Sequence, residues 1–146
     1  MDAARRSTAM LVLALAGLVD SLYLTWYHYD PAVRVCVAFR GCEAVNASRF
    51  ATLAGVPVAV IGVAGYLAIV AALAARRWGP PGPHAPSAYI THGLAVVGTA
   101  FALYLTAIEA LVLHAFCTWC LVSAATITAL CVIATIDLAQ NRTDAG

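Results

Sequence analysis

Residues 115–138 read AFCTWCLVSAATITALCVIATIDL, an apolar run that carries a Cys-x-x-Cys motif at its start. A helix that spans the hydrocarbon core of a bilayer needs about 20 mainly apolar residues, so this stretch is long enough to cross. Cys117 and Cys120 are three positions apart and therefore share one face at the head of the predicted helix. The stretch places a motif typical of redox chemistry or metal binding at the mouth of a membrane helix.

Three further stretches have the length and hydropathy of membrane spans, so the chain is predicted to be an all-α bundle of four transmembrane helices. The predicted spans cover about residues 8–29, 56–75, 88–112 and 115–138. The second is expected to begin at Pro57, whose missing N–H suits a first helical position, and the proline-rich stretch 79–86 is expected to be a linker. Of the 146 residues, 63% are hydrophobic and only 10% are charged, against about 25% charged in soluble domains. We therefore expect one integral membrane domain.

The arginines predict which way the bundle faces. Four spans put both termini and the 76–87 loop on one side, and the 30–55 loop and the short turn near 113–115 on the other. The first side has five arginines and the second three: Arg5, Arg6, Arg76, Arg77 and Arg142 against Arg34, Arg40 and Arg49. Because basic residues are enriched in cytoplasmic loops, we expect cytoplasmic termini and a 30–55 loop in the periplasm or outside the cell. A net charge of +1 argues against a nucleic-acid partner, which requires clustered basic residues.

Four cysteines are predicted to lie in two pairs near the outer membrane face. Cys36 and Cys42 are in the 30–55 loop, and Cys117 and Cys120 begin the fourth span. The partial positive charge of a helix N-terminus stabilises a thiolate, and thiolate attack passes electrons from one cysteine pair to another. The arrangement indicates an electron relay. A structural disulfide in the loop remains open, as does a zinc site, although five residues between the loop cysteines fit zinc poorly.

Three stretches together resemble the vitamin K epoxide reductase family, its bacterial members in particular. They are GLVDSLYLTWYHY (17–29), CVAFRGCEAVNASRFATLAGVPVAVIGVAGYL (36–67) and YLTAIEALVLHAFCTWCLVSA (104–124), and the order of the cysteine pairs matches as well. The resemblance implies a four-helix bundle around a quinone, with a short half-helix in the periplasmic loop between the first two spans. It also implies the inner membrane of a bacterium. The quinone would be ubiquinone, menaquinone or a vitamin K-type quinone.

The same resemblance implies roles for the cysteines. Cys36 and Cys42 would exchange electrons with a thioredoxin-like protein and then with Cys117, and Cys120 would deliver them to the quinone. This is the activity of a thiol–quinone oxidoreductase that supports disulfide bond formation. Many bacterial members carry a fused thioredoxin-like domain. This chain ends shortly after its last predicted span, so its partner is expected to be a separate protein.

Ser48 matches the serine that the family has in its loop, next to the half-helix beside the quinone. Its hydroxyl also suits the N-cap of a helix over residues 49–54. Ala124 stands where the vertebrate epoxide-reducing branch typically has a tyrosine, which argues against epoxide chemistry. The alternatives are a vitamin K epoxide or quinone reductase that uses thiols, and a non-catalytic membrane scaffold stapled by disulfides.

Two carboxyl groups lie inside predicted spans, where charge is costly and often functional. Glu109 is close to the outer end of the third span and is a candidate quinone-site residue that could relay protons, or a carboxyl bonded between helices. Asp20 in the first span raises the same question. His28, His92 and His114 are spread over three helices, so no metal site is predicted.

Three smaller features complete the expectations. Gly62 and Gly65 form part of a small-residue stripe that favours close helix packing in lipid. Trp119, inside the Cys-x-x-Cys motif, is expected to anchor at the interface and shield the pair from water. Cys131 lies deep in the fourth span and is expected to be a small buried apolar residue.

Overall fold

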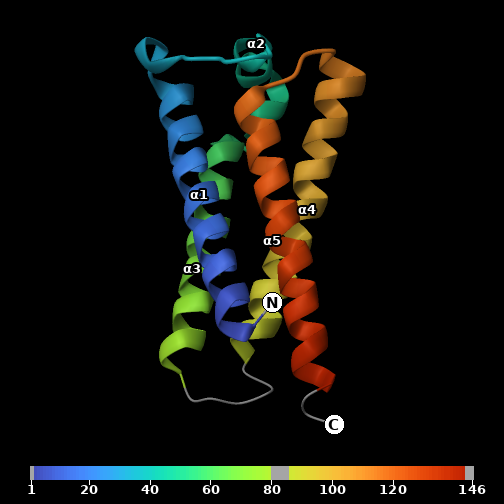
Figure 1. The fold of residues 1–146 in the computed structure, drawn as a ribbon. Helices are drawn as coiled ribbons and strands as arrows, with labels where there is room; N and C mark the ends of the chain where they lie inside the picture. The colour runs from blue at the N-terminus through green and yellow to red at the C-terminus, as the bar shows by residue number, and fades with distance from the viewer. Residues whose placement is uncertain (1, 80–85, 144–146) are drawn as a thin grey trace.

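The computed structural model describes residues 2–79 and 86–143, which form a bundle of four long helices (Figure 1). The helices are α1 (Ala3–Tyr29), α3 (Val58–Trp78), α4 (Pro86–Ile108) and α5 (Thr118–Thr143). All four are long and apolar enough to cross a membrane, so the predicted all-α, four-span architecture is confirmed. The first and last helices are longer than expected, since α1 begins at Ala3 and α5 continues to Thr143. The predicted linker lies, apart from its first and last residues, outside the described residues.

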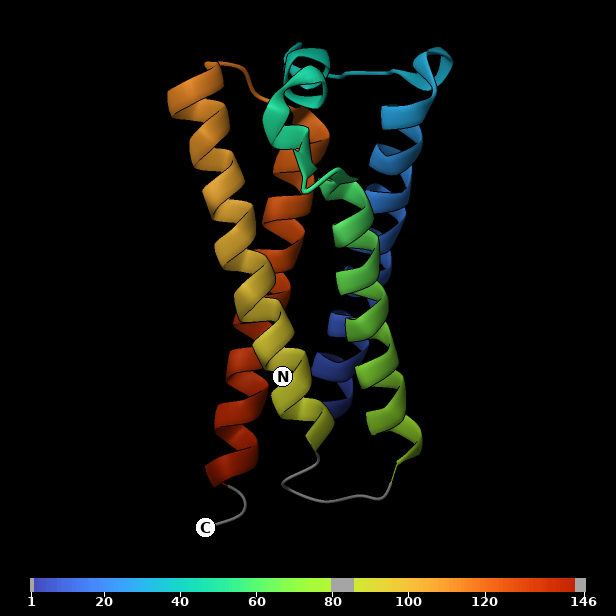
Figure 2. The same cartoon turned by 180° about the vertical axis from the view of Figure 1, so that it is seen from behind.

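The four helices are arranged in a ring in which α1 packs against α3, α3 against α4, α4 against α5, and α5 against α1 (Figures 1 and 2). In lipid, helices associate through close packing more than through a hydrophobic driving force. Glycines supply such contacts: the ring of Tyr66 lies where Gly17 would have a side chain, and Ser21 lies against Gly62. Gly65 differs, because no atom lies within 4 Å of the position its Cβ would occupy.

A buried ion cluster joins three helices at the end of the bundle that holds the chain termini. Asp137 of α5 accepts a hydrogen bond from Arg6 of α1, Nε to Oδ1, at 3.0 Å, and also pairs with Arg76 of α3. The Asp137 side chain is 3% exposed and that of Arg6 7%. From the sequence, the two arginines were used only to predict the orientation of the bundle, and Asp137 was not singled out. Here they fasten α1, α3 and α5 to one another.

The opposite end carries the loop with Cys36 and Cys42, and we call it the cysteine end (Figure 1). Between α1 and α3 the chain forms five short elements: η1 (Pro31–Val33), α2 (Cys42–Ala47), η2 (Arg49–Ala51), and the strands β1 (Thr52–Leu53) and β2 (Val56–Pro57). The predicted half-helix is present, but it begins at Cys42, before Ser48. The strands form a hairpin whose turn includes Gly55 at φ +83°, a conformation that glycine adopts without strain.

Two sequence expectations about this loop were wrong. Ser48 does not cap a helix over residues 49–54 with its side chain; its hydroxyl instead donates to the carbonyl of Val45 at 2.7 Å, in the last turn of α2. Pro57 is not the first residue of α3 but pairs with Thr52 in the hairpin. In both cases the chain before α3 is held by local pairing that the helix signals did not include.

The third span ends in a π-helical turn, Glu109–Leu113, which continues α4. His114 follows with a left-handed conformation, φ +49°, and closes the turn by donating its backbone N–H to the carbonyl of Glu109. Such wide turns are frequent at functional sites. Glu109 is only 3% exposed and lies inside the bundle at the cysteine end.

Candidate redox site

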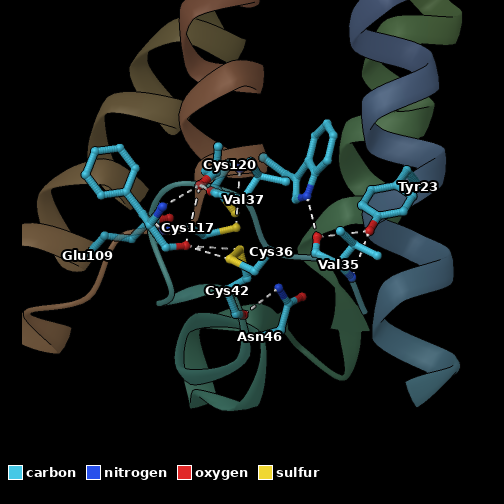
Figure 3. The surroundings of a disulfide bond; sticks show 12 residues. Tyr23, Val35, Cys36, Val37, Cys42, Asn46, Glu109, Cys117 and Cys120 are labelled. Atoms are coloured by element: carbon cyan, nitrogen blue, oxygen red, sulfur yellow. Dashed lines mark hydrogen bonds between the residues drawn. A yellow bond between two sulfur atoms is a disulfide. The ribbon is translucent and has the colours of Figure 1, made fainter. Parts of the chain in front are cut away.

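The structure brings all four predicted cysteines together at the cysteine end (Figure 3). Cys36 and Cys42 form a disulfide with their Cα atoms 5.9 Å apart, whereas Cys117 and Cys120 are free thiols. Cys42 and Cys117 are both completely buried in one cluster with Tyr27, and the other two cysteines pack against it. Two of the four sulfurs are bonded to each other, so the four cysteines do not form a zinc site in this state. The loop pair therefore lies against the pair that begins α5.

The two residues between Cys117 and Cys120 bind the backbone of the loop. The Thr118 hydroxyl donates to the carbonyl of Val37 and accepts from the N–H of Phe39 at 3.1 Å. The Trp119 indole N–H donates to the carbonyl of Val35 at 2.8 Å. The expected interfacial anchor is thus a direct fastening of the loop onto the Cys-x-x-Cys motif.

Further contacts hold the same segment of the loop. Arg40 forms an isolated antiparallel backbone bridge with Cys117. The Tyr23 hydroxyl of α1 accepts from the N–H of Val35 at 3.2 Å, and the Tyr23 ring lies against Trp119 with centroids 4.9 Å apart. The loop disulfide is consequently kept beside Cys117 by hydrogen bonds from two helices.

Replacing Thr118 by valine should slow the predicted electron transfer between the two cysteine pairs about tenfold. The change removes the hydroxyl at nearly constant volume and breaks the bonds to Val37 and Phe39, and tenfold corresponds to about 1.4 kcal/mol, or one to two hydrogen bonds. The measurement is the rate at which a reduced dithiol donor converts the Cys117–Cys120 disulfide to thiols in quinone-free protein. Thr126→Val is the matched control, because the Thr126 hydroxyl bonds only within α5. An equal rate in both variants would contradict a fastening role.

The environment of Cys117 suits a nucleophilic sulfur. Its backbone N–H donates to Oε2 of Glu109 at 3.0 Å, and the backbone N–H of Cys120 points at its sulfur from 3.4 Å. A hydrogen bond from the Cys120 thiol lowers the pKa of Cys117 below its ordinary value, although burial and the nearby Glu109 carboxyl act in the other direction. The thiolate, which is the form that attacks disulfides, is therefore favoured at Cys117.

Glu109 lies beside both cysteines of the motif (Figure 3). It holds the backbone of Cys117 and also interacts with the Cys120 thiol. The single thiol proton of Cys120 can be donated to the Cys117 sulfur or to the Glu109 carboxyl. The π-helical turn thus places a proton acceptor directly beside the pair.

A cavity of about 450 Å³ opens inside the bundle next to Cys120. Its walls come from all four long helices and from α2, and they are mostly apolar. Cys120 lines the cavity and Cys117 does not, while the two other predicted site residues, Ser48 and Glu109, both line it. Apolar pockets of this size with a few polar groups are typical small-molecule sites. The lining suits a largely apolar molecule that carries a few polar atoms.

The comparison with known families agrees with this geometry. The model of the "Vitamin K epoxide reductase family" matches residues 8–135, which include all four cysteines and most of the four helices. The chain belongs to the vitamin K epoxide reductase family. Members of this family are membrane oxidoreductases whose function joins disulfide and quinone redox chemistry.

In this member of the family, several polar groups beside the cavity were not found from the sequence. Asn46 lines the cavity and donates its side-chain N–H to the carbonyl of Cys42 at 3.0 Å. Its position four residues after Cys42 was a usable signal, because both lie on one face of α2. His28 also lines the cavity, as do Tyr66 and Ser123. Nothing in the local sequence indicates that Tyr66 faces this cavity.

Proposed function

We propose that this protein is a membrane thiol–quinone oxidoreductase that oxidises a separate thioredoxin-like protein and so supports disulfide bond formation. Electrons would pass through Cys36 and Cys42, then through Cys117 and Cys120, to a quinone. The observation that carries the proposal is the different placement of the two thiols: Cys117 is buried against the loop disulfide, and Cys120 lines the apolar cavity. One thiol faces the pair that meets the donor, and the other faces the site that fits the acceptor.

Burial supports an order of attack within the loop pair. Cys36 is partly exposed, whereas Cys42 is completely buried beside Cys117. A donor thiolate attacks the Cys36 sulfur and releases the Cys42 thiolate, and the second donor thiol then frees Cys36 as the donor leaves oxidised. The Cys42 thiolate attacks Cys117 of the Cys117–Cys120 disulfide, and Cys36 resolves the mixed disulfide. Two electrons have then moved from the donor to the pair that begins α5.

At the cavity, the chain's own residues bind the acceptor and manage protons. Ser48 and Asn46 provide hydrogen-bonding groups in the wall formed by α2 and the residues that follow it, and the apolar walls exclude water. A bound quinone supplies an acceptor for two electrons and two protons. Glu109 is placed to take the Cys120 thiol proton as the Cys117–Cys120 disulfide forms and to pass that proton on to the acceptor in the cavity. A two-electron step gains about 1.4 kcal/mol for each 30 mV between the couples, so an oxidising quinone drives it forward.

The orientation proposed from the arginines would put the cysteine end on the side where a soluble thiol donor can reach it. A cysteine end outside the cytoplasm of a bacterial inner membrane would meet a soluble thiol donor where disulfides persist. Both termini would then be cytoplasmic. The lipid would supply the quinone to the bundle.

Quinone reduction is better supported than epoxide reduction. Ala124 lines the cavity, and its methyl group offers no hydroxyl to a bound epoxide. A scaffold function is poorly supported as well, because Cys117 and Cys120 are free thiols beside a cavity.

The decisive experiment is anaerobic quinone reduction by the purified protein with a reduced thioredoxin-like donor. We expect quinol to form at the rate at which donor thiols disappear, with one quinol for each donor disulfide. Ubiquinone and menaquinone analogues are compared in parallel to identify the acceptor. Absence of quinol with every donor and acceptor would refute the proposal.

Replacing Gly65 by leucine should block the acceptor site without unfolding the bundle. Gly65 lines the cavity, and a Cβ added there meets no neighbouring atom within 4 Å, so a larger side chain can extend from this position. We expect the KM for quinone to rise at least about tenfold, because the added volume competes with the ligand. Gly93→Leu is the matched control, since that position on α4 is equally open but does not line the cavity. If both variants show the wild-type KM, the acceptor binds elsewhere.

A further inference from the structure

Asp20 is a buried carboxyl group that the function described so far does not use. It lies on α1 nine residues before Tyr29, so it is about 14 Å along the helix from its cysteine end. The residue is 7% exposed, and neither carboxyl oxygen has a completed hydrogen bond among the described residues. A buried polar group without a partner is rare in native proteins, and a carboxyl inside a membrane span is costly. A buried carboxyl group of this kind inside a membrane span therefore indicates a functional role.

The polar neighbour of Asp20 is the Ser123 hydroxyl, which faces it from α5. Ser123 is three residues after Cys120 and therefore lies on the same face of α5, one turn deeper. Both residues line the cavity, whereas Asp20 lies just behind its wall. Ser123 is thus the group through which the carboxyl can reach a molecule in the cavity.

Tyr66 completes this polar site from α3. Its hydroxyl lies 3.3 Å from the backbone oxygen of Ser123 and 3.5 Å from the Ser123 hydroxyl. The Tyr66 ring can cross α1 only because residue 17 is glycine: a Cβ there would lie 2.1 Å from the ring. Three helices therefore meet at one polar point in a mostly apolar wall, one turn from the Cys120 thiol.

We propose that Asp20, acting through the Ser123 hydroxyl, is the group that supplies a proton to the electron acceptor bound beside Cys120. This rests on the proposed function. The need for such a group follows from the proton balance. Reducing a quinone to a quinol takes two electrons and two protons, but a Cys117 thiolate with a Cys120 thiol carries only one proton. Asp20 supplies the second through Ser123, the pair becomes a disulfide, and Asp20 is left as a carboxylate.

The cycle closes when the pair is reduced again. The loop dithiol that reduces the Cys117–Cys120 disulfide brings two electrons and two protons, of which one remains on Cys120 and the other returns to Asp20. The overall reaction is donor dithiol plus quinone to donor disulfide plus quinol, with no other reactant. The titratable groups that face Asp20 are Tyr66 from α3 and Cys120 from α5, the two helices packed against α1.

Asp20→Asn tests the proposal, because the amide keeps the shape of the side chain but does not supply the proton. We expect quinol formation to fall at least about 100-fold, the usual range for loss of a general acid. Supply of the proton is lost as pH rises and Asp20 ionises, so the wild-type rate should fall on the alkaline side. This fall in rate at alkaline pH should disappear in the variant, whereas a fall caused by ionisation of Tyr66 or Cys120 would persist in both proteins. Asp20→Glu should restore part of the rate.

Two measurements separate this role from a structural one. The first is the quinone Kd, followed by quenching of tryptophan fluorescence. The second is the rate at which the donor reduces the Cys117–Cys120 disulfide in quinone-free protein. Both should stay within about threefold of wild type. Thr91→Val is the control, because Thr91 carries another buried hydroxyl that has no partner among the described residues and does not line the cavity. This change should alter neither activity nor pH profile.

Each outcome decides. The proposal is overturned if the Asp20→Asn protein forms quinol at a third or more of the wild-type rate, or if its rate still falls at high pH as in wild type. It is also overturned if the folded variant loses quinone binding or the reduction of Cys117–Cys120 by the donor. If Asp20→Asn does not fold, Ser123→Ala decides: it must retain thiol transfer and lose quinol formation at least tenfold, and a normal rate refutes the relay. If wild-type protein forms no quinol with any donor, the proposed function itself fails.

Discussion

Replacing Cys120 by serine should abolish quinone reduction and leave Cys117 covalently joined to the loop. Without Cys120, the Cys117 thiolate attacks the Cys36–Cys42 disulfide, and no second thiol of the motif can displace the loop. Alkylation of the freed Cys36 thiol prevents it from reversing the attack. Cys42 is the expected partner, because it and Cys117 are buried in the same cluster. We expect a rate loss of at least about a thousandfold, since the covalent route to the acceptor is removed. Acid quenching, alkylation and non-reducing peptide mass spectrometry identify the bonded pair.

Two further variants make this result specific. Cys131→Ala removes the remaining cysteine of α5, which packs against the apolar core away from the cavity, and should keep full activity. Cys120→Ala should also trap the mixed disulfide, but only at higher pH than Cys120→Ser. Attack requires the Cys117 thiolate and is lost as pH falls through the pKa of Cys117, and the hydrogen bond from residue 120, which serine retains, lowers that pKa. A trapped species that lacks Cys117, or equal pH profiles, would contradict the assignment.

Replacing Asp137 by alanine should reduce the free energy of unfolding by about 3 kcal/mol, the cost typical of breaking a buried ion pair. The Asp137 carboxylate lies between the Arg6 and Arg76 guanidinium groups and links three helices. Its removal leaves two positive charges near each other without the group that compensated them. The effect is measured by reversible denaturant unfolding in detergent micelles, followed by circular dichroism.

An exposed carboxylate at the same end provides the control. Asp2 is exposed, and its replacement by alanine should change the free energy of unfolding by less than about 0.5 kcal/mol. Folded Asp137→Ala protein should still transfer thiols at the wild-type rate, because the cysteines lie at the other end of the bundle (Figure 1). A loss of stability below 1 kcal/mol would show that the cluster is not a major fastening of the helices.

The four helices could be predicted because each depends on a local property. A segment that crosses a bilayer must be long and apolar and must form its backbone hydrogen bonds within itself. Residues 115–138 and the three other spans show this length and hydropathy in the sequence. The same locality made the face shared by Cys117 and Cys120 predictable, since spacing along one helix determines it. Errors appeared where a local signal competed with another local contact, as at Ser48, whose hydroxyl bonds back to Val45.

The contents of the site were harder to read, because its members come from segments far apart in the chain. Glu109 could be recognised as a costly carboxyl in a span, but its bond to the N–H of Cys117 depends on a π-helical turn. Thr118 and Trp119 carry no signal that they would bind the backbone of a loop about 80 residues earlier.

Sequence alone therefore determined that the chain is an integral membrane protein with four long helices and two cysteine pairs. It also determined the family that these features indicate. The family resemblance already implied that Cys117 meets the loop pair and Cys120 the acceptor. Tertiary structure alone decided which residues from all four helices form the cavity that Cys120 lines, and that Asp20 meets Ser123 behind the cavity wall. The physical reason is one of range. Helix formation and the spacing of residues on a helix face are set within a few residues. Which faces of α1, α3 and α5 meet is set by the packing of whole helices, where a glycine such as Gly17 makes room for a ring from another span.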